Sequence, residues 1–323
     1  MKNIGIITSG GDSPGMNAAI RSIVKTAYYY RINCFGILFG FKGLINGNII
    51  NLCTIDVKNI INRGGTILKT ARSKEFETKE GRKKAYKNFK KKKLDGLIII
   101  GGNGTLTGAK IFEEEYNIPI IGIPGTIDND IYGSDCTIGY DTALNTVIVA
   151  IDKIRDTATS HNRLFFIEVM GRESGFIALN SGIATGALNI MLPEKNYNIN
   201  NLFKSIDKGN KEGKSSSIII VSEDKKIQKA YSLAKITKKK YPNYEIRVSI
   251  LGHIQRGGNP TCFDRVLASK LGFFSVKSLI DGKYGFIVGS KENKISYTLL
   301  KEFNKKKNKI DEELIKISKI LFF

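Results

Sequence analysis

Apolar runs of strand length alternate with helix-like stretches along most of this chain, and this alternation restricts the possible folds more than any other feature. The strand-like runs lie near residues 3–8, 34–39, 95–100, 118–123, 164–169, 188–192, 216–222 and 246–251. Helix-like stretches lie at residues 16–30, 79–93, 138–158, 225–240, 264–281 and in the tail. Asp56 is expected to cap a further short helix that Gly64 and Gly65 end. The pattern predicts an α/β protein with largely parallel sheets flanked by helices, and a chain of 323 residues is long enough for two domains.

Taken alone, the net charge of the chain suggests that the protein binds a polyanion such as a nucleic acid. The formal net charge is +21, but the lysines are spread in short runs. No zinc-finger, RNP-type or basic-zipper pattern accompanies them, so we expect no nucleic-acid partner. The longest apolar runs are about strand length, so we expect no membrane partner. The glycine-bounded N-terminus does not resemble a secretory signal, and four scattered cysteines without a CxxC pair fit a reducing cytoplasm.

Five polar, glycine-rich loops follow five of the strand-like runs. They are SGGDSPGMN (9–17), GGNGT (101–105), PGTIDND (124–130), MGRESG (170–175) and LGHIQRGG (251–258). Ligands of open parallel sheets bind beyond the carboxyl ends of the strands. One such loop is usually an ordinary turn, whereas five with this content predict a shared site.

The residue types in these loops favour phosphoryl transfer. Glycines let backbone N–H groups approach phosphate oxygens, and the N-terminus of a following helix adds a positive dipole end. The carboxylates of Asp128 and Asp130 are suited to holding Mg²⁺ or accepting a proton. Arginine binds phosphate through its planar fork, and we assign five arginines to this class of loop: Arg72, Arg163, Arg172, Arg247 and Arg256. Phosphoryl transfer requires positioning and charge stabilisation more than covalent catalysis.

Longer motifs in collinear order resemble the bacterial-type 6-phosphofructokinase family over nearly the whole chain. They are TSGGDSPGMNAAIR (8–21), INRGGT (61–66), GGNGT, PGTIDND, EVMGRESG (168–175) and LGHIQRGGNP (251–260). The resemblance implies two α/β domains with largely parallel sheets flanked by helices, a homotetramer and a glycolytic kinase. Such a kinase transfers the γ-phosphate of ATP, with Mg²⁺, to the 1-hydroxyl of fructose 6-phosphate.

The resemblance also implies how the chain is divided. A larger nucleotide-binding domain would comprise residues 1–139 plus about 256–305. A smaller sugar-phosphate-binding domain would comprise residues 140–255 plus about 306–323.

Roles are carried over only to positions that match the family's motifs. Asp128 would be the catalytic base with Thr126 beside it, and Arg72 and Arg172 would stabilise charge on the transferring group. ATP would bind at Gly11, Arg72, Gly102, Asn103, Gly104 and Thr105. Fructose 6-phosphate would bind at Thr126, Asp128, Asp130, Arg163, Met170, Gly171, Arg172, Glu223, Arg247, His253 and Arg256. Asn103 and Asp130 would hold the metal, and Arg163 and Arg247 would reach the neighbouring subunit's site.

Two glycines decide which phosphoryl donor the resemblance favours. Pyrophosphate-using relatives typically carry an aspartate where this chain has Gly104 and a lysine where it has Gly125. Glycine at both positions favours ATP. The alternatives are a pyrophosphate-dependent enzyme and a binding or regulatory homologue with weakened catalysis.

Asn103 and the effector site depart from the family's pattern. The family usually has an aspartate where Asn103 stands, so weaker metal binding is expected, unless the asparagine only caps a helix beginning near Thr105. The effector site would use Arg21, Lys25, Arg155 and Lys214. Thr54 and Leu188 replace an arginine and an acid that are common there, so we expect weak regulation.

Overall fold

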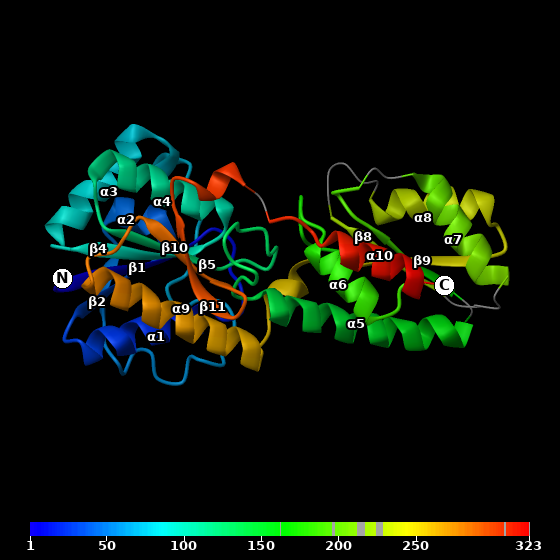
Figure 1. Ribbon diagram of the computed structural model, residues 1–323, viewed down its shortest axis with the longest axis horizontal. Coiled ribbons are helices and arrows are strands. Elements are labelled where there is room, and N and C mark those ends of the chain that lie inside the picture. Colours follow the sequence, from blue (N-terminus) through cyan, green and yellow to red (C-terminus); the bar gives the residue numbers. More distant parts are fainter. Residues whose placement is uncertain (162, 196–197, 212–216, 224–228, 307, 323) are drawn as a thin grey trace. The chain divides into compact units, whose positions relative to one another are not determined.

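The chain folds into two compact α/β units, which are drawn in Figure 1. The computed structural model describes residues 1–161, 163–195, 198–211, 217–223, 229–306 and 308–322. The larger unit comprises Met1–Thr142 and Arg256–Asn308, and the smaller comprises Ala143–Gln255 and Lys309–Phe323. The chain therefore passes from one unit to the other after Thr142, after Gln255 and after Asn308.

The larger unit contains a sheet with the strand order β11-β10-β5-β4-β1-β2-β3. Its strands are β1 (Asn3–Ser9), β2 (Asn33–Ile37), β3 (Ile49–Leu52), β4 (Gly96–Gly101), β5 (Ile120–Pro124), β10 (Phe286–Lys291) and β11 (Lys294–Leu299). The five strands from β10 to β2 are mutually parallel, and the edge strands β3 and β11 are antiparallel to their neighbours. The predicted α/β class is confirmed, although the sequence pattern did not anticipate β3, β10 and β11.

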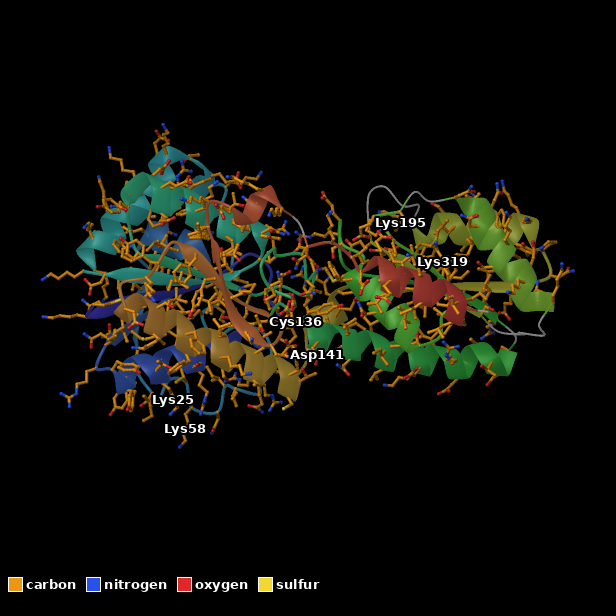
Figure 2. The ribbon with its side chains drawn as sticks, viewed as in Figure 1. Lys25, Lys58, Cys136, Asp141, Lys195 and Lys319 are labelled. Atoms are coloured by element: carbon orange, nitrogen blue, oxygen red, sulfur yellow. The ribbon has the colours of Figure 1, made fainter. Side chains whose placement is uncertain are left out.

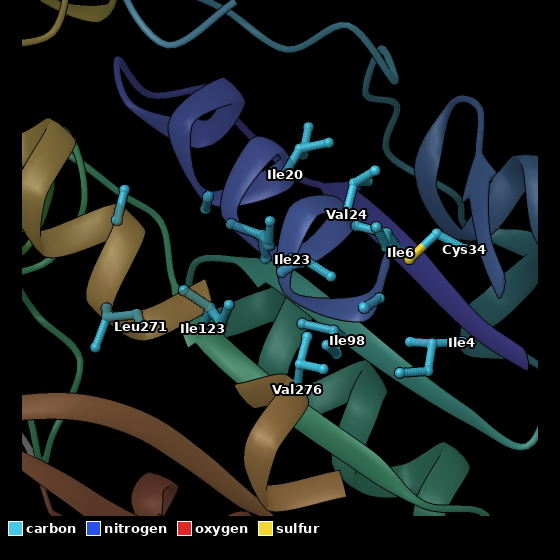
Figure 3. Packing of buried hydrophobic residues seen from close by; sticks show 14 of the residues in the cluster. Ile4, Ile6, Ile20, Ile23, Val24, Cys34, Ile98, Ile123, Leu271 and Val276 are labelled. Atoms are coloured by element: carbon cyan, nitrogen blue, oxygen red, sulfur yellow. The ribbon is translucent and has the colours of Figure 1, made fainter. Parts of the chain in front are cut away.

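Helices cover both faces of this sheet. They are α1 (Met16–Tyr29), α2 (Gly40–Asn46), α3 (Lys79–Lys91), α4 (Asn103–Tyr116) and α9 (Cys262–Ile280). The central strands alternate: Ile98 and Ile100 of β4 join the cluster packed under α1 and α9, which Figure 3 shows. Leu97 and Ile99 join the cluster packed under α2, α3 and α4. Side chains of a strand point alternately to its two faces, so each strand contributes to both cores.

The helices α1 and α4 follow neighbouring strands, and their placement is of the kind that creates a binding crevice in open parallel sheets. The neighbouring strands β1 and β4 are followed by α1 and α4. These helices pack on opposite faces of the sheet. Loops that leave adjacent parallel strands toward opposite faces diverge, and ligands of open sheets bind where they do so. The fold therefore points to the carboxyl ends of β1 and β4.

The smaller unit has a parallel sheet with the strand order β7-β8-β6-β9. Its strands are β6 (Arg163–Val169), β7 (Asn189–Met191), β8 (Ser217–Ser222) and β9 (Glu245–Ile250). Its helices are α5 (Tyr140–His161), whose first three residues belong to the larger unit, α6 (Phe176–Ala184), α7 (Ile199–Lys211), α8 (Ala230–Lys240) and α10 (Glu312–Leu321). Apolar residues of α7 and α8 pack with Leu164, Phe166, Ile219 and Val221 of the strands. The second group of glycine-rich loops, residues 170–175 and 251–258, follows the ends of β6 and β9.

Two helix predictions had different outcomes. The predicted terminal helix is α10, and the carboxylate of Asp311 caps it by accepting hydrogen bonds from the backbone N–H groups of Glu313 and Leu314. The predicted helix after Asp56 is wrong, because residues 54–59 form turns. The Asp56 carboxylate instead accepts a 2.7 Å hydrogen bond from the backbone N–H of Cys53. Among the described residues, the helices all fall short of the length and apolarity needed to cross a membrane.

Candidate active site

Three of the glycine-rich loops begin level with one another at one edge of the larger unit's sheet. In the parallel register, Ser9 of β1 pairs with Gly101 of β4, and Gly101 pairs with Pro124 of β5. Each of these residues is the last of its strand. The loops that start at Gly10, Gly102 and Gly125 therefore leave the sheet side by side. This is the convergence that the sequence predicted for these three loops.

Side chains fasten the loop after β1 to its neighbours. The hydroxyl of Thr70 donates a 2.7 Å hydrogen bond to the carbonyl of Gly10, and the hydroxyl of Thr105 donates a 2.9 Å bond to the carbonyl of Ser9. Gly10 has a φ of 85°, a left-handed conformation that favours glycine. Thr70 also ties in the exposed segment that carries Arg72. These two hydrogen bonds hold the start of the loop through its backbone carbonyls, so its conformation does not depend on a bound ligand.

Arg256 lies directly over Gly11. A Cβ atom at Gly11 would fall 2.1 Å from Nη1 of Arg256, so only glycine admits the guanidinium there. The same nitrogen donates a 3.2 Å hydrogen bond to the carbonyl of Asp12. The structure therefore brings a residue expected to bind sugar phosphate against a loop expected to bind ATP. A cation in this position adds to the attraction of the loop for phosphate.

Helix α4 begins at Asn103, so Gly102 occupies the N-cap position. The first N–H groups of a helix have no partner within the helix, and its N-terminus carries a partial positive charge. Apart from its chain neighbours and the backbone of its own helix, no described atom lies within 4 Å of the place that a Cβ at Gly104 would take. The start of α4 is therefore an open, dipole-polarised end suited to an anion.

The amide of Asn103 contacts the carboxylate of Asp130. Asn103 Nδ2 donates a 2.6 Å hydrogen bond to Asp130 Oδ2, across the gap between the loops after β4 and β5. The alternative in which Asn103 only caps a helix near Thr105 is wrong, because Asn103 is already helical and its side chain points to Asp130. The pair offers one amide oxygen and one carboxylate, which are hard oxygen ligands of the kind that Mg²⁺ prefers.

The loop that carries Asp128 and Asp130 is held by the asparagine between them. Asn129 is buried and has a φ of 52°, a left-handed conformation that asparagine tolerates better than most residues. Its side chain donates a 2.9 Å hydrogen bond to the carbonyl of Asp135 and accepts one of 2.9 Å from the backbone N–H of Thr137. Sequence reasoning missed this role, although an asparagine between two aspartates after a Pro-Gly turn is a signal for it.

Asp264 fixes the far end of the same loop. Its buried carboxylate accepts 2.8 Å hydrogen bonds from the backbone N–H groups of Gly139 and Thr142, at the start of α5. Burial raises the pKa of Asp264, and the hydrogen bonds from Thr142 and Gly139 oppose that shift. Because Asp264 lies in the first turn of α9, it joins the ends of two helices that are distant in the sequence. The loop that carries Asp128 and Asp130 is therefore held from within by Asn129 and at its far end by Asp264.

The smaller unit assembles a second group of predicted site residues. Val169 pairs with Ser222, and Glu168 pairs with Ile250, so β6, β8 and β9 end nearly level. Met170, Gly171, Arg172, Glu223 and His253 follow these ends. Buried Gln255 accepts a 3.1 Å hydrogen bond from the backbone N–H of Met170, which links the segment carrying His253 to the loop after β6. Gln255 is a positioning residue that the sequence reasoning did not single out, although it lies in a quoted motif.

Arg163 and Arg247 do not lie in the glycine-rich loops, so that part of the sequence prediction is wrong. Arg163 is the first residue of β6, and Arg247 lies within β9. The length of β6 places Arg163 roughly 20 Å along the strand from Val169, which precedes Met170. Both arginines form salt bridges with Glu245, and the Arg163 Nε–Glu245 Oε2 distance is 2.9 Å. The contact with the guanidinium of Arg163 lowers the pKa of Glu245. Within this unit, the two arginines are separated from the residues that follow β6.

A separate pocket of about 320 Å³ lies beside α1. Arg21 and Lys25, which we expected at an effector site, line it together with Thr54, and Lys58 adds a cation that was not anticipated. Figure 2 labels Lys25 and Lys58 at this part of the larger unit. Arg155 belongs to the smaller unit, where its guanidinium donates to the carbonyl of Thr185, and Lys214 lies outside the described residues. The pocket thus retains cationic lining despite Thr54.

Comparison with known proteins gives consistent matches. A family model described as phosphofructokinase matches residues 3–279. The ATP-dependent 6-phosphofructokinase 2 of Bacteroides thetaiotaomicron is 50% identical over 321 residues, covering 99% of this chain and 98% of the relative. The ATP-dependent 6-phosphofructokinase of Bacillus licheniformis is 51% identical over 329 residues, covering 99% of each chain. The crystal structure of Pichia pastoris phosphofructokinase in the T-state has a TM-score of 0.90 and 34% identity, covering 99% of this chain and 36% of that longer chain.

Proposed function

This chain belongs to the phosphofructokinase family, and from that premise we propose that it transfers the γ-phosphate of ATP to the 1-hydroxyl of fructose 6-phosphate in glycolysis. The observation that carries the proposal is the level ending of β1, β4 and β5. It brings a glycine cradle, the start of a helix and two aspartates to one edge of a sheet. These are the parts that phosphoryl transfer requires: anchored phosphates, positive charge and a base for the acceptor hydroxyl.

Asp128 is the general base in this proposal. Its carboxylate accepts the proton of the sugar hydroxyl as that oxygen attacks the γ-phosphorus. Thr126 steadies the base, because its hydroxyl accepts a 3.2 Å hydrogen bond from the backbone N–H of Asp128. The guanidinium groups of Arg72 and Arg172 stabilise the charge on the transferring group. Both arginine side chains are exposed, so they are open to substrate.

The nucleotide occupies the edge formed by the loops after β1 and β4. Its phosphates accept hydrogen bonds from backbone N–H groups of Gly11 and of the first turn of α4, Gly102 to Thr105. The hydroxyl of Thr105 is engaged with the carbonyl of Ser9, so its contribution to ATP comes from its backbone. The larger unit is accordingly the nucleotide-binding domain. The smaller unit binds the sugar phosphate through Met170, Gly171, Arg172, Glu223 and His253.

Asp130 and Asn103 are the residues that would hold Mg²⁺. Their side chains meet, and a carboxylate with an amide oxygen fits an ion that takes one or two protein ligands and fills its remaining positions with phosphate oxygens and water. When bound, the ion neutralises negative charge on the phosphates of ATP. Asp128 is left for proton transfer.

ATP rather than pyrophosphate is the donor in this proposal. The two curated relatives described above are named as ATP-dependent enzymes. The space beside Gly104 is open, which leaves room for the rest of a nucleotide. A Cβ at Gly125 would lie 2.9 Å from Cγ2 of Ile100, so a lysine there would require a shift of the core. These features disfavour the pyrophosphate-dependent alternative.

The test of the proposed function is a coupled assay for fructose 1,6-bisphosphate. We expect product from fructose 6-phosphate with ATP and Mg²⁺, and little with pyrophosphate. Product formed mainly with pyrophosphate would overturn the choice of donor. A protein that binds both substrates but makes no product would instead support a regulatory homologue, for which Asn103 is the supporting feature.

We also propose that the enzyme acts in the cytoplasm as a homotetramer. Arg163 and Arg247 are separated from the loop after β6 within their own unit, which fits the family-based expectation that they serve the site of a neighbouring subunit. The four cysteines are free, in accord with a reducing compartment. Sedimentation velocity at assay concentrations tests the oligomeric state.

Replacing Asn103 by aspartate is expected to strengthen metal binding. Asn103→Asp would place a second carboxylate beside that of Asp130, where an amide now donates. The two carboxylates repel each other in the absence of metal, and a bound metal ion gains a second charged ligand. We expect the half-saturating Mg²⁺ concentration to fall about tenfold, and the melting temperature without Mg²⁺ to fall as well. Asn117→Asp, at the other end of α4, is the control. Unchanged Mg²⁺ dependence in Asn103→Asp would show that Asn103 only tethers Asp130.

Regulation by ADP is expected to be weak. The pocket beside α1 keeps Arg21, Lys25 and Lys58, but Thr54 has no planar fork to bind a phosphate at two points. We expect saturating ADP to lower the half-saturating fructose 6-phosphate concentration less than about fivefold, the lower end of typical allosteric coupling. Saturation curves with and without ADP measure it. A larger shift that Lys58→Ala abolishes would show that three cations suffice.

A further inference from the structure

Asn308 lies where the chain leaves the larger unit for the last time. Its half-buried side chain reaches the loop that carries the two aspartates. Nδ2 donates hydrogen bonds of 2.8 Å to the carbonyl of Ser134 and 2.9 Å to the carbonyl of Ile131. The carbonyl of Asn129 is a third, weaker acceptor at 3.4 Å. An amide nitrogen has two hydrogens, so the two short bonds use both, and the third shares one of them.

We propose that Asn308 is a positioning residue for the phosphoryl transfer, a role that rests on the function proposed above. Three carbonyl oxygens converge on one point, and their partial negative charges repel unless a donor lies between them. The amide of Asn308 is that donor. Without this donor, the three carbonyls would move apart and change the conformation of the loop. That loop carries both the base and the metal-binding carboxylate.

The connection from Asn308 to the reacting groups is short. Asn129, whose carbonyl Asn308 contacts, lies between Asp128 and Asp130 in the chain. The side chain of Asn129 holds the loop from within through Asp135 and Thr137, and Asn308 holds it from the C-terminal segment. A change in the position of the Asn129 peptide therefore moves both carboxylates. A displacement of about 1 Å in a catalytic group is enough to reduce turnover strongly.

The experiment compares variants of Asn308 in the full-length protein. Asn308→Ala removes the donor, and we expect the turnover number to fall about tenfold while half-saturating ATP and fructose 6-phosphate stay nearly constant. Asn308→Asp is expected to be at least as damaging, since a carboxylate cannot donate to three carbonyls. Asn308→Gln keeps the amide and should recover part of the loss.

Hydrogen exchange supplies a measurement that does not depend on activity. In Asn308→Ala we expect faster exchange in peptides covering residues 126–137, with the remainder of the larger unit unchanged. Asn304→Ala is the matched control, because Asn304 lies on the same segment but donates its 3.1 Å hydrogen bond to the hydroxyl of Thr107 on α4. That control should leave both turnover and exchange in residues 126–137 as in the unmodified protein.

Each outcome decides the question. Unchanged turnover or unchanged local exchange in Asn308→Ala overturns the proposal, as does faster exchange over the whole unit together with a lower melting temperature. A lower turnover number, unchanged half-saturating substrate concentrations and faster exchange confined to residues 126–137 together support it. If the unmodified protein makes no fructose 1,6-bisphosphate, the proposed function fails, and the exchange result still decides whether Asn308 holds the loop.

Discussion

Asp128→Asn should lower the turnover number by roughly 10²–10⁴-fold, the usual contribution of a general base. Asparagine has nearly the same shape as aspartate but cannot take the proton of the sugar hydroxyl at neutral pH. Its backbone N–H can still donate to Thr126, so the loop should keep its conformation. Half-saturating concentrations of ATP and fructose 6-phosphate should change little. Steady-state kinetics with each substrate varied in turn measure both effects.

Asp135→Asn is the matched control for that experiment. Asp135 lies in the same loop, and its carboxylate accepts a 2.7 Å hydrogen bond from the backbone N–H of Glu292, which an asparagine oxygen can also accept. The same chemical change there should leave turnover close to that of the unmodified protein. If Asp128→Asn weakened substrate binding while turnover stayed normal, Asp128 would be a binding residue and another group would be the base.

Loss of either Arg163 or Arg247 should weaken the binding of fructose 6-phosphate. An arginine-to-phosphate contact contributes about 1.5–3 kcal/mol, which corresponds to roughly 10–100-fold in half-saturating concentration. Saturation with ATP should change little in Arg163→Ala and Arg247→Ala. Glu245→Gln is the control, since it removes the shared salt-bridge partner and leaves both arginines. An exposed ion pair contributes little, so this variant should bind the sugar phosphate nearly normally.

Mixed oligomers test whether these arginines act across a subunit interface. Arg163→Ala and Asp128→Asn chains are each expected to be defective alone. If a site takes Asp128 from one chain and Arg163 from another, co-assembled oligomers regain part of the activity. Absence of any recovery in oligomers proven to be mixed would contradict a shared site, as would full activity in a stable monomer.

Local sequence patterns were sufficient for the elements and for much of the site. β1 alternates residues between two cores, with Ile4 and Ile6 on one face and Ile7 on the other, and its run of apolar residues predicted a buried strand. Asp128 and Asp130 follow β5 as the PGTIDND loop implied. The edge strand β11 escaped detection because its mixed, half-exposed residues resemble a loop.

Distances along a strand separate residues that motif reasoning grouped together. The residue pattern predicts one class of loop for both Arg163 and Arg172. They lie at opposite ends of β6, because Arg163 starts the strand and Arg172 follows its last residue. A strand extends the chain by roughly 3.3 Å per residue, so a few residues of separation become a long distance in space. Only the strand's exact bounds reveal this.

The sequence by itself determined the α/β class, the buried strands and the loops with phosphate-binding character, because hydrophobic periodicity and glycine content act over a few neighbouring residues. The tertiary structure alone decided that β5, β4 and β1 lie side by side and end level. It also decided that Asn103 meets Asp130 and that Asn308 reaches Ile131, 177 residues away in the chain. Such pairings arise when whole faces of a sheet and its helices pack together, and the free energy of that packing is a property of the assembled core rather than of any short segment.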